Sequence, residues 1–127
     1  MRNGVRLAVM LGAVLTALLV VACTGRGGGG GAGGLTIVAK RGAFEFVPAN
    51  VTVAANTTVT IVLQNPDSQI HDWTIDDVPG IGRIHLVADP GKTVSGRFTF
   101  TQPGTYRIYC SQPGHTEAGM VGQLTVR

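Results

Sequence analysis

A thiol, an imidazole and a thioether follow one another at even spacing near the C-terminus. Cys110, His115 and Met120 lie five residues apart along one segment. A thiolate, an imidazole and a thioether form a soft ligand set that suits copper changing between Cu(I) and Cu(II). Pro113 and Gly114 favour a turn between the cysteine and the histidine, so the segment can fold back and bring its ligands to one point. These residues predict a copper-binding loop.

A mononuclear electron-transfer site of this chemistry uses two histidines, one cysteine and a distant axial methionine, so a second histidine is needed. Only His71 and His85 remain to supply it. We favour His71, because it opens an apolar alternating run, 71–75, that would hold it rigidly. His85 alternates outward in its own expected strand, which favours an ordinary surface histidine.

Two simpler interpretations stay open for this loop. The three side chains could meet by chance, and Cys110 could be a buried, inert thiol. The chain has two cysteines, and Cys23 has a different expected role. Cys110 would then be alone in an oxidising compartment, where cysteines usually pair. Metal ligation accounts for the lone thiol and for the histidine and methionine that follow it.

The first 22 residues have the pattern of a secretory signal peptide. Arg2 and Arg6 precede an apolar stretch, 7–21, which is short for a membrane span. The sequence Val-Val-Ala-Cys at 20–23 resembles a bacterial lipobox, in which the peptide is cut before the cysteine and a lipid is attached to it. We therefore expect a lipoprotein anchored through Cys23. A signal without lipidation and an uncleaved anchor are alternatives, and each places the protein outside the cytoplasm.

Residues 23–34 form the expected linker, since they are mostly glycine and such a composition behaves as a flexible coil. The remaining 35–127 is long enough for a single core. The formal charge of +3 includes Arg2 and Arg6, which leave with the signal peptide, so the mature protein is close to neutral. No basic cluster indicates nucleic-acid binding, and we expect a monomer.

The domain is expected to be all-β. Apolar residues alternate with period two, β-branched residues are dense, and no helical stripe is found. Several short strands separated by turn signals, at 65–67, 79–80, 89–91 and 102–104, suggest a sandwich or barrel. The expected strands are 35–40, 50–54, 57–64, 71–75, 84–87, 93–100, 104–109 and 121–127.

The same alternation places the ligands. Tyr106, Ile108 and Cys110 share one face of a strand, so the thiol points into the end of the sandwich if that face is the core. The ligand loop then leads into strand 121–127, which can pair beside the cysteine strand. His71 comes from a strand distant in sequence. This arrangement predicts a preformed pocket at one pole of a rigid fold.

At these residues the chain resembles the cupredoxins, the small type 1 blue-copper proteins. The Cys-x4-His-x4-Met spacing is most similar to that of the auracyanin and rusticyanin members, with plastocyanin a shorter variant. The resemblance covers 35–127 and implies a Greek-key β-sandwich with one mononuclear copper ion. It makes His71, Cys110 and His115 the equatorial ligands and Met120 the axial one. It also rests on Gly-Thr-Tyr at 104–106, Pro-Gly-His at 113–115 and Gly-Met-Val-Gly at 119–122.

The resemblance implies a one-electron carrier working between redox proteins, with a membrane respiratory or photosynthetic complex as a candidate partner. The alternative is a copper-handling protein, a chaperone or buffer with the same fold. A dinuclear site would need a second cysteine where the chain has Gly114, and His85 alone cannot complete a second copper centre. We therefore do not expect an enzyme. The edge of His115, in an apolar patch, is the expected route for the electron.

Two neighbours of the ligands are expected to line the site, Asp72 and Ser111. Many cupredoxins have asparagine directly after the first histidine ligand, where it ties the two ligand loops together. A charged Asp72 would stabilise Cu(II) and lower the reduction potential, whereas a protonated one could imitate the asparagine. A plain turn-stabilising role for Asp72 is equally open.

Overall fold

The computed structural model describes residues 33–127. The expected signal peptide, the lipidation site at Cys23 and most of the glycine-rich linker lie outside the described residues. Within 33–127 no helix has the length and apolar character needed to cross a membrane.

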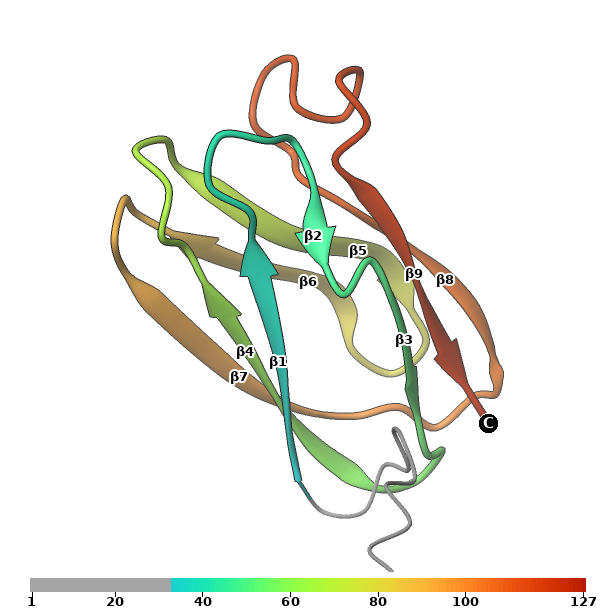
Figure 1. The fold of residues 1–127 in the computed structure, drawn as a ribbon. Coiled ribbons are helices and arrows are strands. Elements are labelled where there is room, and N and C mark those ends of the chain that lie inside the picture. The colour runs from blue at the N-terminus through green and yellow to red at the C-terminus, as the bar shows by residue number, and fades with distance from the viewer. Residues whose placement is uncertain (1–32) are drawn as a thin grey trace, which may run out of the picture.

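Two mixed β-sheets face each other across one core, which confirms the all-β sandwich (Figure 1). Apolar and polar residues alternate along these short strands, so each strand can bury one face and expose the other. One sheet has the order β2-β1-β4-β7 and the other β3-β9-β8-β5-β6. The strands are β1 (Gly34–Ala39), β2 (Phe46–Val47), β3 (Asn50–Val53), β4 (Thr58–Gln64), β5 (His71–Val78), β6 (Gly82–Ala88), β7 (Thr93–Thr99), β8 (Gly104–Tyr109) and β9 (Val121–Val126).

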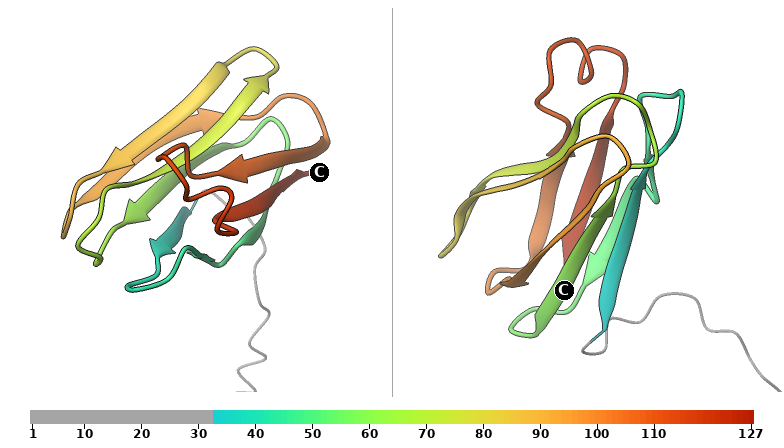
Figure 2. Two further views of the ribbon diagram at one scale, coloured as in Figure 1. Left: turned by 90° about the horizontal axis from the view of Figure 1, so that it is seen from above. Right: turned by 90° about the vertical axis from the view of Figure 1, so that its left-hand side faces the viewer.

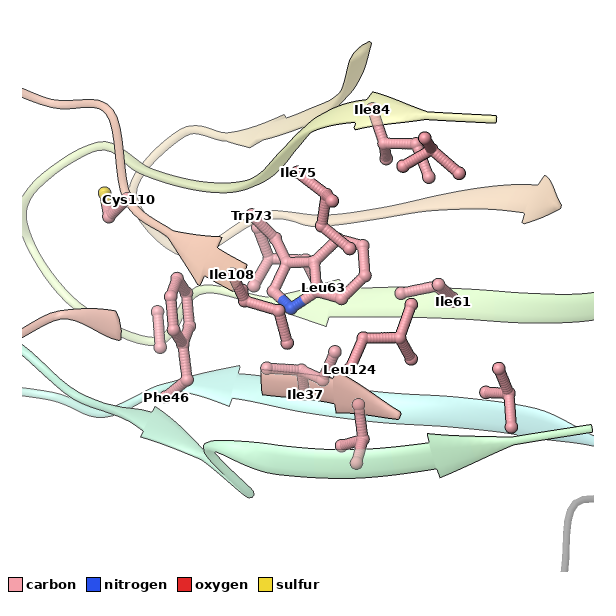
Figure 3. Packing of buried hydrophobic residues seen from close by; sticks show 14 of the residues in the cluster. Ile37, Phe46, Ile61, Leu63, Trp73, Ile75, Ile84, Ile108, Cys110 and Leu124 are labelled. Atoms are coloured by element: carbon pink, nitrogen blue, oxygen red, sulfur yellow. The ribbon is translucent and has the colours of Figure 1, made fainter. Parts of the chain in front are cut away.

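The core lies between the sheets and is built from their inward-facing residues. Trp73, Phe46 and Phe100 are its largest side chains, each at most 1% exposed. Cys110 lies at one end of this cluster, past Phe46 and Ile108 (Figure 3). The thiol is therefore set on a packed apolar base. The core also contains Ile37, Ile61, Leu63, Ile75, Ile84 and Leu124.

Strand pairing brings the segments of the expected site to one pole. β8 and β9 pair antiparallel, with Tyr109 opposite Val121, so the loop 110–120 connects two neighbouring strands. β5 pairs with β8 through Thr74 and Tyr109, which places the start of β5 beside the end of β8. The loops after β1 and β4 lie at the same pole (Figure 2). β1 begins at the opposite pole and runs toward it (Figure 1).

Eight of the nine strands among the described residues match expected strands, with ends that differ by up to three residues. β5 continues to Val78 past a β-bulge between Ile75 and Val78. β2 was not predicted, because a strand of two residues is too short to show a period. It pairs with β1 at the edge of its sheet.

Candidate metal centre

Three ligand-type side chains converge at this pole. The potential ligand atoms of His71, Cys110 and His115 lie within 4.8 Å of one another. His71 and Cys110 are fully buried and His115 is 7% exposed. Met120, the fourth residue predicted from the sequence, is also fully buried. The four residues come from β5 and from the loop 110–120.

Backbone hydrogen bonds close the loop that carries three of these residues. The Cys110 N–H donates to the Met120 carbonyl at 3.1 Å, and the Met120 N–H donates to the His115 carbonyl at 3.0 Å. The Thr116 hydroxyl donates to the Cys110 carbonyl at 2.6 Å. Gly114 and Gly119 have positive φ values of 82° and 102°, which lets the chain make both turns. The loop is therefore held in place by its own backbone.

His71 presents a free ring nitrogen to the cluster. Its Nε2–H donates to Asp67 Oδ2 at 3.0 Å, since a carboxylate can only accept. Its Nδ1 is buried and has no hydrogen-bond partner among the described residues. A buried acceptor without a partner is costly unless something binds it. A metal ion coordinated at Nδ1 removes that cost, so the residues fit such an ion.

The thiol and the second imidazole are equally suited to a metal. Cys110 Sγ lies 3.4 Å from His115 Nδ1 and accepts the Asp72 N–H at 3.4 Å. Burial raises the pKa of Cys110, with the Asp72 charge adding to it. Burial, and then the nearby His71, lower the pKa of His115, which keeps its imidazole neutral. A metal ion that binds here must displace the thiol proton.

Comparison with known proteins decides the family. A family model of the cupredoxin-like domain matches residues 12–126. The chain belongs to the cupredoxins. The cofactor expected from the sequence, one type 1 copper ion, is confirmed by this membership together with the buried His-Cys-His cluster.

Curated relatives of this cupredoxin include plant plastocyanins and a bacterial cuproprotein. Chloroplastic plastocyanin of Hordeum vulgare is 34% identical over 79% of this chain and 66% of its own length. Plastocyanin of Rumex obtusifolius is 36% identical over 68% and 91%. The copper-resistant cuproprotein CopI of Rubrivivax gelatinosus is 32% identical over 65% and 60%. The chain spans between about half and just under two thirds of the length of the first two curated relatives it matches.

Solved auracyanin structures share the fold of this cupredoxin. Auracyanin from Roseiflexus castenholzii superposes with a TM-score of 0.70 at 21% identity, covering 78% of this chain and 99% of its own. Auracyanin A from Chloroflexus aurantiacus gives 0.65 at 26% identity, covering 74% and 98%.

In this cupredoxin Asp72 joins the two segments that carry the cluster. Its Oδ1 accepts from Thr74 Oγ1 at 2.7 Å and from the Ser111 N–H at 2.8 Å. Its Oδ2 accepts from Ser111 Oγ at 2.9 Å and from Gln112 Nε2 at 2.8 Å. Burial pushes the pKa of Asp72 upward, but the hydrogen bonds from Ser111, Thr74 and Gln112 outweigh it and hold the pKa below its usual range. Asp72 is therefore a carboxylate at neutral pH.

His85 lies outside the cluster. Its side chain is 39% exposed, and its Nε2 lies 3.7 Å from Asp72 Oδ2. His85 therefore lies at the surface, as expected from the sequence. Its ring also approaches the buried carboxylate of Asp72.

Three residues near the cluster were not singled out from the sequence: Asp67, Gln112 and Phe44. Phe44, in the loop between β1 and β2, packs its ring 4.8 Å from that of His115. Its side chain is 39% exposed. Phe44 therefore places an exposed apolar ring beside His115. Four apolar or small residues near His115 in the sequence are exposed as well: Pro113, Gly114, Ala118 and Val121.

Proposed function

We propose that this cupredoxin is a one-electron carrier whose copper ion would be held by His71, Cys110, His115 and Met120. The observation that supports this most directly is the buried Nδ1 of His71, which lacks a partner and lies in the same cluster as a thiol and a second imidazole. A bound copper ion supplies Cu(I)/Cu(II) redox chemistry. The chain's own contribution is to hold the ligands in one geometry through both oxidation states.

Several contacts support rigidity at this site. The ligand loop is closed by its own backbone bonds, and Asp72 ties it to β5. The thiol rests on packed core residues. A site that is already assembled needs little rearrangement when the metal charge changes, which favours fast transfer.

The electron is proposed to leave through His115. This imidazole is 7% exposed and lies against the exposed ring of Phe44. A small apolar contact without strong charge suits a partner that must leave quickly. The partners are proposed to be redox proteins, among them possible membrane complexes.

The visible spectrum of the purified protein with Cu(II) tests this proposal. We expect an intense absorption band near the red end that reductant bleaches reversibly. In Cys110→Ser the band is absent, because a thiolate must bind copper to produce it. His85→Ala is the matched control and keeps the band, since His85 lies outside the cluster. A colourless wild-type protein would contradict the proposed site.

Copper handling is a second candidate, and the similarity to a copper-resistant cuproprotein favours keeping it. A delivery site must open to exchange its ligands, whereas this cluster is enclosed. Measuring how fast Cu(I) passes to a chelator separates the two functions. Slow release with rapid electron exchange supports the carrier, and rapid release with slow electron exchange supports copper handling.

The protein is proposed to work outside the cytoplasm, at the outer face of the cytoplasmic membrane or in the periplasm, anchored by a lipid on Cys23. The expected lipobox at 20–23 supports this location. Mass spectrometry of the mature N-terminus tests it directly. A mature protein that begins at Cys23 and carries the mass of a lipid would support the anchor, and an N-terminus without lipid would contradict it.

A further inference from the structure

A second carboxylate, Asp67, touches the cluster from the side of His71. Asp67 lies in the loop between β4 and β5, within the expected turn at 65–67. Its Oδ2 is 3.0 Å from His71 Nε2, and the two side chains are 6% and 0% exposed. It is therefore a buried acid in direct contact with an imidazole that the proposed site uses.

Hydrogen bonds within the loop hold this carboxylate in place. Asp67 Oδ1 accepts the Ser68 N–H at 2.8 Å, and the Asp67 N–H donates to Asn65 Oδ1 at 3.0 Å. Asn65 in turn donates its Nδ2 to the carbonyls of Gln69 and Ala88, at 2.7 and 2.8 Å. Each Asp67 oxygen thus accepts an N–H. Two oxygens that both accept an N–H fit the ionised carboxylate, which can only accept.

The contact with Asp67 determines which His71 nitrogen carries the proton. The carboxylate requires Nε2–H, and a proton on Nδ1 would be buried without an acceptor among the described residues. A ring with its proton on Nε2 donates to Asp67 and leaves no buried N–H without an acceptor at Nδ1. Carboxylates that accept from a ligating imidazole fix its tautomer and make it a stronger donor.

We propose that Asp67 is a positioning residue that orients His71 and, through its negative charge, favours Cu(II) over Cu(I) at the site. A neutral backbone carbonyl would orient the ring equally well, so the charge is what distinguishes this contact. A negative charge behind the imidazole stabilises the more highly charged ion. This inference rests on the proposed function, because it takes His71 as a ligand.

The test compares Asp67→Asn with Asp77→Asn in the copper-loaded full chain. Asp77 lies near the far end of β5, roughly 20 Å along the strand from His71, and carries the same charge. Its positive φ of 53° accepts asparagine. Dissociation constants for Cu(II) and Cu(I) are measured separately by chelator competition, together with the reduction potential and the visible spectrum.

We expect Asp67→Asn to keep a thiolate-copper band and to lose about tenfold in Cu(II) affinity relative to Cu(I). For one electron this ratio corresponds to a potential raised by about 59 mV. Asp77→Asn should stay close to wild type. A potential in Asp67→Asn equal to that of Asp77→Asn would overturn the inference while leaving the proposed function intact. A wild-type protein without the band would overturn both.

A second measurement needs no variant and so does not depend on how Asp67→Asn folds. Nitrogen NMR of the metal-free wild-type protein reports the tautomer of His71. We expect the proton on Nε2. A proton on Nδ1 would show that Asp67 does not orient the ring, and would overturn the inference.

Discussion

Asp72 places a full negative charge beside the thiolate position. Its backbone N–H donates to Cys110 Sγ, and its carboxylate accepts four hydrogen bonds. Of the interpretations open from the sequence, the protonated one does not agree with its lowered pKa. The Asp72 carboxylate therefore has two roles at once. It links β5 to the ligand loop, and it places a negative charge near the metal position.

We expect Asp72→Asn to raise the reduction potential at neutral pH, because the charge that favours Cu(II) is removed. The amide nitrogen replaces an oxygen that accepts two of the four hydrogen bonds and cannot accept either of them, which costs about 1–3 kcal/mol in the free energy of unfolding. Voltammetry from about pH 5 to about pH 8 and denaturant unfolding measure the two effects. Potentials that match wild type across that range would exclude the charge effect.

The lowered pKa of Asp72 also sets a pH dependence. A carboxyl group whose pKa is lower in the folded state contributes stability above its unfolded value, near 3.8, and loses it as the pH falls through the folded value. The metal-free wild type should therefore lose more stability between neutral pH and about pH 2 than Asp72→Asn does. Equal losses in urea unfolding would contradict this assignment.

At the scale of elements, β9 depends on a glycine where it passes the connection between β2 and β3. A Cβ at Gly122 would overlap the Ala49 carbonyl oxygen, which accepts the Gln123 N–H at 3.0 Å. β9 follows directly after Met120, so its position also sets the end of the ligand loop.

We expect Gly122→Ala to lower the free energy of unfolding by about 1–3 kcal/mol, because backbone must shift to make room. Gly34→Ala is the control. At Gly34 an added Cβ would meet only the Thr60 carbonyl oxygen, at an ordinary 3.8 Å. Urea unfolding measures both variants, and equal stabilities would show that β9 does not need the glycine.

Element identity was largely predictable because alternation shows in strands of four residues or more. Cys110 and His71 could be placed at strand ends for the same reason. The contacts of Asp67 and Phe44 could not. Both lie in loops without a period, and each meets its histidine only once the sheets have packed. Asp67 was expected in a turn, which is correct, but a turn signal does not say what the side chain faces.

For the whole molecule, a copper site that only the folded chain assembles links metal binding to stability. Copper binds the folded state, so free Cu(II) at a hundred times its dissociation constant adds about 2.7 kcal/mol of stability. For a domain of this size the melting temperature should rise by roughly 10–20 °C. Thermal melts with Cu(II), and again after a chelator, measure this shift. Cys110→Ser should show little of it, and an equal shift in that variant would point to copper binding elsewhere.

The direction of β1 has a consequence for how the domain meets a partner. The described chain begins at the pole opposite His115, so anything attached upstream holds the domain by its far end. If the proposed lipid on Cys23 anchors the protein, the copper pole is the end of the domain that lies away from the point of attachment. A soluble partner would find that pole directly. A partner embedded in the same membrane would be reached only after the domain rotates. The effective concentration of the copper pole at that partner would then depend on the length of the linker.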